Sequence, residues 1–356
     1  MFNLMYKDTV VLSFDTDSKS VEFLNEDLLP LSVFYRERNY DIVRKFCSDR
    51  VLVLNRSYCK EILLACGIES QDDVSICIAC KGLSFRDNYW IKESNSSDTW
   101  ESVNLYTNTF STLISRTALT GEMDSDAVLD DKVFTGELTS KGTRAKCFVR
   151  DGDKLYLYKN ETVGEIASEI ISFYIARAFK LPASKYVAKK LYGKECSVCQ
   201  IATSEDYELI PCRDIMSMYN CAMNYDTDYY GAFMALCGAQ FVKMQIFDYI
   251  TLNSDRNRDN FGILRYKGKL VNIYPLFDHD SCFKSKSVDG LYFPTGMSFK
   301  QTLNLLKTEY SEIYATVVDD IKALACFLRS NDFKNYFTKY KTIEEYNSML
   351  VRLNDL

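Results

Sequence analysis

The stretch FDYITLNSDRNRDNFGILRYKGKLVNIYPLFDHDSCF, residues 247–283, decides the fold that we expect for this chain. It contains Asp255, Asn260 five positions later, two apolar segments joined at Gly268, and then Asp278. Phosphoryl transfer to a hydroxyl group requires one carboxylate that positions the hydroxyl, and an amide oxygen and a second carboxylate that hold magnesium on the nucleotide phosphates. The stretch therefore predicts a catalytic loop with Asp255 as the catalytic residue, followed by a metal loop with Asn260 and Asp278 as magnesium ligands.

The order of the neighbouring elements gives this pattern its specificity. Aspartate and asparagine are common loop residues, so their spacing alone has little weight. Residues 230–249 are apolar on most faces and predict one buried helix that leads towards Asp255. A hairpin predicted for residues 261–277 returns Asp278 to the side of Asn260. This order disfavours the competing interpretation of a coincidental set of loop residues.

Residues 134–159 predict a pair of antiparallel strands upstream of the catalytic loop. Gly142 lies in a bend rich in serine, threonine and lysine, and Asp151-Gly152 predicts the hairpin turn. Such a bend can bring backbone N–H groups to phosphates, and a lysine at the end of the second strand can reach them. Many solvated hairpins share this composition, so the pattern supports nucleotide binding only together with the downstream motifs.

Residues 161–179 predict a long amphipathic helix with Glu165 and Glu169 on one face. Either carboxylate can pair with Lys159 on the preceding strand, as a kinase requires, and a solvated acidic face is the alternative interpretation.

Composition bounds the class of protein. The 356 residues include 43 Lys+Arg against 49 Asp+Glu, so no overall basic character attracts nucleic acid, and we expect no direct nucleic-acid binding. The acidic residues near the N-terminus do not match a signal peptide, and no segment approaches the length of a membrane span. We therefore expect a cytoplasmic protein without membrane contact. Its 13 cysteines then act as buried apolar residues, and the pairs Cys77/Cys80 and Cys196/Cys199 lack the spacing of a zinc site.

The predicted elements divide the chain into three parts. An alternating strand over residues 5–15 opens it, and a strand, turn and strand follow over 73–91. We expect a domain boundary near residues 113–124, where the acidic segment 117–130 begins. A strand over 207–212 predicts the hinge between two lobes. We expect a small N-terminal mixed α/β domain (1–115), a β-rich kinase N-lobe with one helix (125–215), and a helical C-lobe (216–356) with terminal helices over 298–307, 310–329 and 343–353.

Four stretches of the sequence resemble the HipA-like serine/threonine kinases, bacterial toxin-type enzymes. NSDRNRDNFGIL (253–264) is similar to the catalytic loop N-x-D-R-H-x-x-N-F of that family, and PLFDHDSCF (275–283) to its metal loop. GTRAK, from Gly142 to Lys146, resembles the G-x-x-x-K nucleotide loop, and SEIISFYIARAFKL (168–181) the helix with the ion-pairing glutamate. The resemblance implies a bilobal α+β fold that is protein-kinase-like and related to phosphatidylinositol kinases.

The resemblance also implies roles for individual residues. Lys159 would contact the α- and β-phosphates of ATP, and Glu169, rather than Glu165, would orient it. Asp255 would be the catalytic aspartate, with Mg²⁺ held by Asn260 and Asp278. Autophosphorylation in the nucleotide loop is implied at a position that here is Thr139, with Ser140 and Thr143 as alternatives. The remaining nucleotide-binding residues implied are Gly142 and Lys146.

Two positions depart from the family pattern, Asn257 in place of histidine and Asp280 in place of a small residue. An asparagine can still make a loop hydrogen bond, so we expect activity to survive, and Asp280 is either an extra metal ligand or merely exposed. His279, the only histidine, is interpreted as a packed or hydrogen-bonded loop residue rather than a general base, because a carboxylate already fills that role.

The function expected is an ATP- and magnesium-dependent serine/threonine protein kinase acting on a protein substrate, a toxin in the manner of the family with a helix-turn-helix antitoxin as partner. Two alternatives stay open. In the first alternative, the chain is a pseudokinase or binding module without phosphotransfer. In the second, it is a kinase that phosphorylates a lipid or small molecule. The identity of the substrate, the existence of an antitoxin and the oligomeric state are not readable from the sequence.

Overall fold

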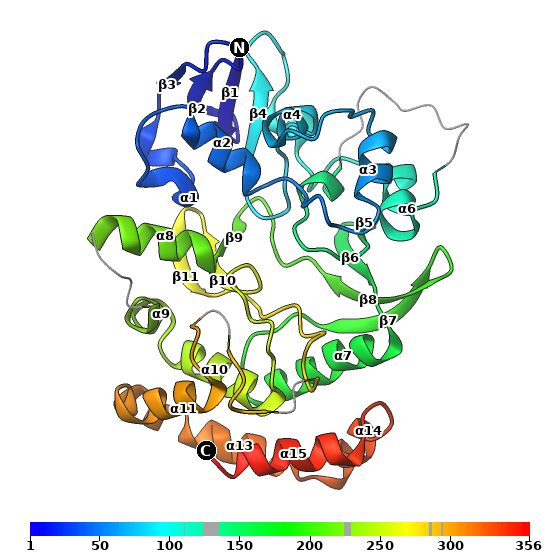
Figure 1. Ribbon diagram of the computed structural model, residues 1–356, viewed down its shortest axis with the longest axis vertical. Coiled ribbons are helices and arrows are strands. Elements are labelled where there is room, and N and C mark those ends of the chain that lie inside the picture. Colours follow the sequence, from blue (N-terminus) through cyan, green and yellow to red (C-terminus); the bar gives the residue numbers. More distant parts are fainter. Residues whose placement is uncertain (110, 124–134, 224–228, 285–286, 293–294) are drawn as a thin grey trace. The chain divides into compact units, whose positions relative to one another are not determined.

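The computed structural model describes residues 1–356 except 110, 124–134, 224–228, 285–286 and 293–294 (Figure 1). The chain divides into two compact units. The first unit consists of Met1–Asn160, Lys189–Ile210 and Ser217–Tyr225, and the second of Glu161–Ala188, Pro211–Met216 and Asp226–Leu356.

A four-stranded antiparallel sheet with the order β3-β2-β1-β4 opens the first unit. The prediction of a single strand over residues 5–15 is wrong, because the chain reverses at Lys7, whose φ of 49° lies in the left-handed region. Two strands flank this turn and pair with each other. The strands are β1 (Phe2–Tyr6), β2 (Thr9–Phe14), β3 (Val21–Phe23) and β4 (Tyr89–Glu93).

Short helices connect this sheet to the rest of the first unit. The strand predicted at the start of residues 73–91 is instead a helix, because Asp72 caps it by accepting a hydrogen bond from the Ser75 N–H at 2.9 Å, and Ile76 and Cys77 form its buried face. The helices are α1 (Leu31–Phe34), α2 (Asp41–Ser48), α3 (Cys59–Ala65), α4 (Asp73–Ala79), α5 (Trp100–Val103) and α6 (Thr112–Thr120), with 3₁₀ turns η1 (Glu26–Leu28) and η2 (Glu137–Thr139).

The boundary predicted near residues 113–124 falls largely on α6, and residues 124–134 lie outside the described residues. One hydrophobic core of the first unit contains residues from both sides of this segment. Leu12 and Phe46 belong to it together with Cys147, Tyr158 and Val198 of the second sheet. The division into domains 1–115, 125–215 and 216–356 stays a prediction.

The second sheet has the strand order β5-β6-β8-β7, and its predicted hairpin is confirmed. Gly152, with a φ of 58°, forms the turn, and Lys146 on the first strand is the register partner of Lys159 on the second. Its four strands are β5 (Lys146–Asp151), β6 (Lys154–Asn160), β7 (Tyr186–Leu191) and β8 (Lys194–Gln200). The next strand along the chain, β9 (Tyr207–Pro211), is the strand predicted before the hinge.

Helix α10 (Ala239–Thr251) is the centre of the second unit, and all its residues from Phe241 to Thr251 are buried. It contacts α7, α9, α11, α12 and α15. The single helix predicted over 230–249 is two helices, because Gly238 has φ 48° and ψ −121°, a conformation that is strained for any residue with a side chain. The three helices that precede α10 along the chain are α7 (Val163–Ala178), α8 (Cys212–Met223) and α9 (Tyr229–Cys237).

After α10 the chain forms the predicted hairpin and then a series of helices (Figure 1). Gly268, with a φ of 83°, turns β10 (Gly262–Tyr266) into β11 (Lys269–Ile273). The helix predicted over 310–329 breaks at Val317, and α14 was not predicted. These helices are α11 (Phe299–Thr308), α12 (Ser311–Thr316), α13 (Val318–Leu328), α14 (Asn331–Phe337) and α15 (Ile343–Leu353). The α+β class is confirmed.

Candidate active site

The predicted catalytic loop begins where α10 ends. Leu252 adopts the left-handed conformation, with a φ of 48°, and stops the helix. The next residue, Asn253, is fully buried, and its side-chain Nδ2 donates to Asp248 Oδ1 at 3.2 Å. Asn253 Oδ1 in turn accepts the N–H of Asp255 at 3.3 Å. The buried helix therefore determines where the backbone of Asp255 lies.

Two asparagine side chains hold the carboxylate of Asp255. Asn260 Nδ2 donates to the Asp255 carbonyl at 2.8 Å and to its Oδ2 at 3.2 Å. Asn257 Nδ2 donates to Oδ1 at 3.0 Å. Asn257, one of the two departures from the family pattern, therefore makes a loop hydrogen bond to the candidate catalytic residue itself.

Arg256 connects the two candidate loops. Its Nη1 donates to the carbonyl of Asn260 in the catalytic loop at 2.8 Å and to that of Phe277 in the metal loop at 2.8 Å. Its Nη2 lies 3.1 Å from Asp248 Oδ1, and both side chains are fully buried. Burial alone would lower the pKa of Arg256, but the facing Asp248 carboxylate raises it above its ordinary value, so the guanidinium stays charged.

The metal loop is fixed from three sides. Asp278 has a φ of 61°, a left-handed conformation that aspartate tolerates better than most residues, and its N–H donates to the Tyr186 hydroxyl at 3.2 Å. The N–H of His279 donates to Glu169 Oε2 at 2.8 Å. An isolated parallel bridge between Ala183 and Leu276 holds the segment that precedes the loop.

His279 is a buried structural residue. Its Nδ1 lies 3.1 Å from Nη2 of Arg256, which only donates, so Nδ1 accepts and the ring proton is assigned to Nε2. The ring is completely buried and meets Phe247 edge to face, with centroids 5.3 Å apart. These contacts agree with the interpretation of His279 as a packed loop residue.

The carboxylates of both loops are close enough to interact electrostatically. Partial burial raises the pKa of Asp255, the Asn257 hydrogen bond opposes this, and the negative charges of Asp278 and Asp280 raise it further. The net effect is a pKa above that of an ordinary aspartate. Asp280 is itself buried, not merely exposed. The region therefore has an excess of negative charge that a cation would neutralise.

The donors available suit magnesium bound together with a nucleotide. Among the described residues no group of three or more His, Cys, Asp or Glu side chains is arranged to hold a metal alone. Asn260 and Asp278 offer one amide and one carboxylate, and Mg²⁺ is usually held by one or two carboxylates completed by phosphates and water. The residues present fit this mode.

The cysteine pairs show no zinc arrangement in the part of the chain that the structure describes. Cys77 and Cys80 are buried thiols, and Cys80 Sγ donates to the Cys77 carbonyl at 3.5 Å. Burial raises the pKa of both thiols, which keeps them neutral.

Two glutamates of α7 differ in their contacts. Glu165 completes a capping box with Thr162 and forms an ion pair with Lys284 at 2.8 Å. Glu169 is fully buried and accepts from the metal loop, as described above. Its ion pair with Lys159 stays a prediction.

The candidate nucleotide-binding residues lie in the first unit. Lys159 is a buried residue on β6, and Gly142 and Lys146 lie in the loop before and at the start of β5. Gly142 has a φ of 93°, and a Cβ at this position would lie 2.7 Å from Lys146 Nζ. Lys146 Nζ donates to the carbonyl of Lys141. The φ of Gly142 favours glycine at this bend, whereas the flexible Lys146 side chain could move away from a Cβ.

The three candidate phosphorylation sites differ in exposure. Thr139 is 7% exposed, and its hydroxyl donates to the Leu83 carbonyl at 2.5 Å. Ser140 is partly buried, and Thr143 is exposed. Among the three hydroxyl groups, that of Thr143 is therefore the most accessible.

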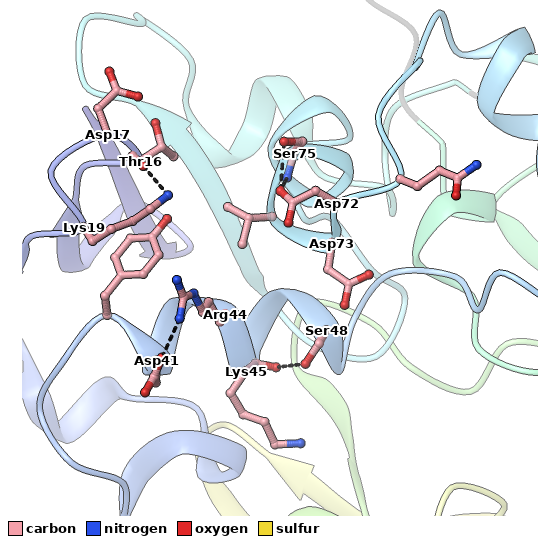
Figure 2. A pocket seen from close by; sticks show the side chains of 13 residues that line it. Thr16, Asp17, Lys19, Asp41, Arg44, Lys45, Ser48, Asp72, Asp73 and Ser75 are labelled. Carbon is pink, nitrogen blue, oxygen red and sulfur yellow. Dashed lines mark hydrogen bonds and ion pairs between the residues drawn. The ribbon is translucent and has the colours of Figure 1, made fainter.

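A cavity of about 880 Å³ lies in the first unit, lined by residues between Thr16 and Ser75 (Figure 2). None of the candidate catalytic, metal or nucleotide-binding residues lines it. Two of its basic groups have acidic partners: Arg44 lies 3.2 Å from Asp41, which also lines the cavity, and Lys45 lies 2.6 Å from Asp49, which does not. The cavity is thus separate from the chemistry proposed for the loops.

The interactions of Asp248 and Tyr292 with the catalytic loop were not predicted. Asp248 Oδ2 accepts a hydrogen bond from the Tyr292 hydroxyl at 2.6 Å, in addition to its contacts with Asn253 and Arg256. A carboxylate in the most apolar helix was the available signal, because charged residues are rarely buried unless paired. Nothing in the sequence indicates Tyr292.

The fold is that of the HipA-like kinases, as the sequence resemblance predicted. HipA of Shewanella oneidensis MR-1, solved as a toxin-antitoxin complex with HipB and operator DNA, matches with a TM-score of 0.58 and 11% identity. The match covers 100% of this chain and 97% of that one. The proinflammatory kinase CtkA of Helicobacter pylori matches with a TM-score of 0.42 and 14% identity, over 60% of this chain and 86% of that one. No family profile and no curated protein sequence matches the chain.

Of the helices that the structure describes, none has the length and apolar character needed to span a bilayer.

Proposed function

We propose that the protein is an ATP- and magnesium-dependent serine/threonine protein kinase of HipA type. The observation that carries this proposal is the buried Arg256, which binds the carbonyls of Asn260 and Phe277 at once and so keeps the catalytic loop beside the loop of Asp278. A kinase requires such an arrangement of a catalytic carboxylate and metal ligands on adjacent loops.

Each candidate residue has a defined task in this proposal. Asp255 orients the acceptor hydroxyl and takes up its proton, since its raised pKa makes it a better base than an ordinary aspartate. Asn260 and Asp278 hold Mg²⁺, which when bound neutralises charge on the transferred phosphoryl group. Lys159, oriented by Glu169, and the loop from Gly142 to Lys146 bind the phosphates of ATP.

The biological setting is proposed from the fold relationship. The HipA structure contains HipB and operator DNA. By analogy, we propose that this chain acts as a toxin with a helix-turn-helix antitoxin as its partner, and that it phosphorylates itself in the nucleotide loop. Because the chain carries a formal charge of −6, we expect a protein partner rather than this chain to contact any DNA.

The test is phosphate transfer by the purified protein with ATP and MgCl₂, to itself and to a bacterial lysate, followed by mass spectrometry. Asp255→Ala and Asp278→Ala are expected to abolish transfer. Asp259→Asn is the matched control, since Asp259 is an exposed carboxylate of the same loop paired with Arg213 at 3.1 Å. Undiminished transfer in both alanine variants would refute the assignment of the site.

A thermal shift with ATP and Mg²⁺ separates the kinase from a binding module without nucleotide. A ligand that binds only the folded state raises the melting temperature. No shift at millimolar MgATP, together with no transfer, would favour the binding module.

A further inference from the structure

The segment of residues 48–57 forms several hydrogen bonds with the candidate nucleotide loop, which we define as residues 137–146. Arg56 is the main contact. Its Nη1 donates to the carbonyl of Glu137 and to that of Ser140 at 3.3 Å, and its Nη2 donates to the carbonyl of Lys146 at 2.8 Å. One guanidinium thus holds both ends and the middle of the nucleotide loop.

Three further hydrogen bonds are also donated by residues 48–57 to carbonyls of the nucleotide loop. The Ser57 N–H donates to the Thr143 carbonyl at 2.8 Å, and its hydroxyl donates to the same oxygen at 3.1 Å. The Leu52 N–H donates to the Leu138 carbonyl at 2.7 Å. In the opposite sense, Lys141 Nζ donates to the Ser48 carbonyl at 2.6 Å. All these residues belong to the first unit.

The burial of Arg56 indicates that these contacts matter. The side chain is only 3% exposed, and a buried cation is tolerated only where acceptors compensate for its lost hydration. Burial lowers the pKa of Arg56 to about 10, with the charge of Glu137 opposing the change, so the guanidinium is still charged at neutral pH. The hydrogen bonds described for it all go to backbone carbonyls of the nucleotide loop.

The orientation of these carbonyls has a consequence for phosphate binding. In a peptide group, the C=O and the N–H point in opposite directions. Carbonyls held towards residues 48–57 therefore turn the following N–H groups towards the other side of the nucleotide loop. Backbone N–H groups presented on one side of a loop can contribute to an anion-binding concavity. The N–H of Thr139 is not one of them, because it donates to the Gly136 carbonyl at 3.3 Å.

We propose that Arg56 is a positioning residue that holds the nucleotide loop in the shape that receives the phosphates of ATP. This inference rests on the proposed kinase function. It assigns a role in nucleotide binding to a residue about 80 positions before the nucleotide loop, in a part of the chain outside the predicted kinase lobes.

The test compares Arg56→Lys with Arg150→Lys. Lysine keeps the charge but lacks the planar fork that reaches several carbonyls. Arg150 is the matched control, because its Nη2 also donates to two backbone carbonyls, those of Leu105 and Asn108, outside the nucleotide loop. In hydrogen exchange without nucleotide, Arg56→Lys is expected to speed exchange within 137–146 and not in the β1-β2 hairpin. Arg150→Lys is expected to leave the exchange of the nucleotide loop unchanged.

Calorimetric titration with MgATP gives the functional readout. Arg56→Lys is expected to raise Kd by about tenfold or more, as the loss of one hydrogen bond to a charged group implies. The KM for the acceptor is expected to stay unchanged. If Arg56→Lys does not fold, Lys141→Met removes the contact with Ser48 and is measured in the same way.

The possible results separate the two proposals. Unchanged exchange of the nucleotide loop, exchange that rises equally throughout the first unit, or an unchanged ATP affinity in a variant with a looser loop would each overturn the role of Arg56. If the wild type binds no ATP, the kinase proposal and the role in ATP binding fail together, while the exchange data still decide whether Arg56 holds the nucleotide loop.

Discussion

Arg256 and Asp248 form an ion pair at 3.1 Å in which neither side chain has any exposure to solvent. The pair joins the end of the central helix to both candidate loops, because Arg256 also binds the carbonyls of Asn260 and Phe277. A buried pair of this kind is weak evidence for net stability, but the loss of one partner leaves an uncompensated charge.

The first prediction concerns this ion pair. Arg256→Met is expected to lower the free energy of unfolding by about 3–5 kcal/mol, because Asp248 is left charged and buried. Adding Asp248→Asn is expected to restore part of the loss, so the two effects are not additive. Urea unfolding of the single and double variants measures this. Arg213→Met, which removes a partly exposed pair with Asp259, is the control, with an expected loss of at most about 1 kcal/mol.

The second prediction concerns Asp255. Asp255→Asn is expected to reduce phosphate transfer by about 10²–10⁴-fold, the usual contribution of a general base, while ATP binding is retained. Transfer rates and calorimetric ATP affinity are measured on the same preparation. A parallel loss of ATP affinity would indicate that Asp255 acts on the nucleotide instead.

The sequence predicted the hairpin between the two candidate loops better than the elements around it, and the roles of Asp255, Asn260 and Asp278 stay predictions. The spacing of Asp255, Asn260 and Asp278 is local, and a hairpin with Gly268 at its turn returns the chain to the same place. The predicted elements were wrong where a single residue breaks or caps a helix, because the apolar pattern of the surrounding segment does not reveal such a residue. Gly238 breaks an otherwise continuous apolar segment, and Asp72 turns a predicted strand into α4.

Contacts between residues far apart in the sequence could not be predicted from local patterns. Tyr292 reaches Asp248 across 44 positions, and Arg56 reaches Lys146 across 90. Both depend on the packing of a complete unit. By contrast, Arg256 lies inside the catalytic-loop motif that the sequence predicted. Only its hydrogen bonds to both loops were not predicted.

The third prediction concerns the pKa of Asp255 in the metal-free protein. The charge of Asp280 raises this pKa and the Asn257 hydrogen bond lowers it. Asp280→Asn is therefore expected to lower the pKa of Asp255, and Asn257→Ala to raise it. Carboxyl NMR titration measures both. Shifts of the same sign in the two variants would contradict this account.

The same reasoning predicts the pH dependence of transfer. Only the ionised carboxylate accepts a proton, so activity falls as the pH drops through the pKa of Asp255. Because that pKa is raised, the fall is expected at a higher pH than for an ordinary aspartate. With bound metal the cation offsets the charge of Asp280, so the effect of Asp280→Asn on the pH profile is expected to be smaller than in the metal-free titration.

The fourth prediction concerns magnesium. Asn260→Ala removes one proposed ligand, and Asp278→Asn replaces a charged ligand with a neutral amide. Both are expected to raise the Mg²⁺ concentration needed for half-maximal transfer. Titration of Mg²⁺ at saturating ATP measures this. Asn272→Ala, an exposed asparagine on β11, serves as the control and is expected to leave the Mg²⁺ curve unchanged. A lower maximal rate at an unchanged Mg²⁺ requirement would contradict a role as ligands.

The fifth prediction concerns the site of autophosphorylation. Thr143 is exposed, whereas the Thr139 hydroxyl is buried and donates to the Leu83 carbonyl. Phosphate on Thr139 would require that contact to break and a charged group to enter the interior, which is costly. We therefore expect Thr143→Ala to remove most of the incorporated phosphate and Thr139→Val to leave its amount nearly unchanged. Phosphopeptide mass spectrometry, with Ser140→Ala as the third variant, distinguishes the sites. Phosphate found mainly on Thr139 would mean that the nucleotide loop opens before it is modified.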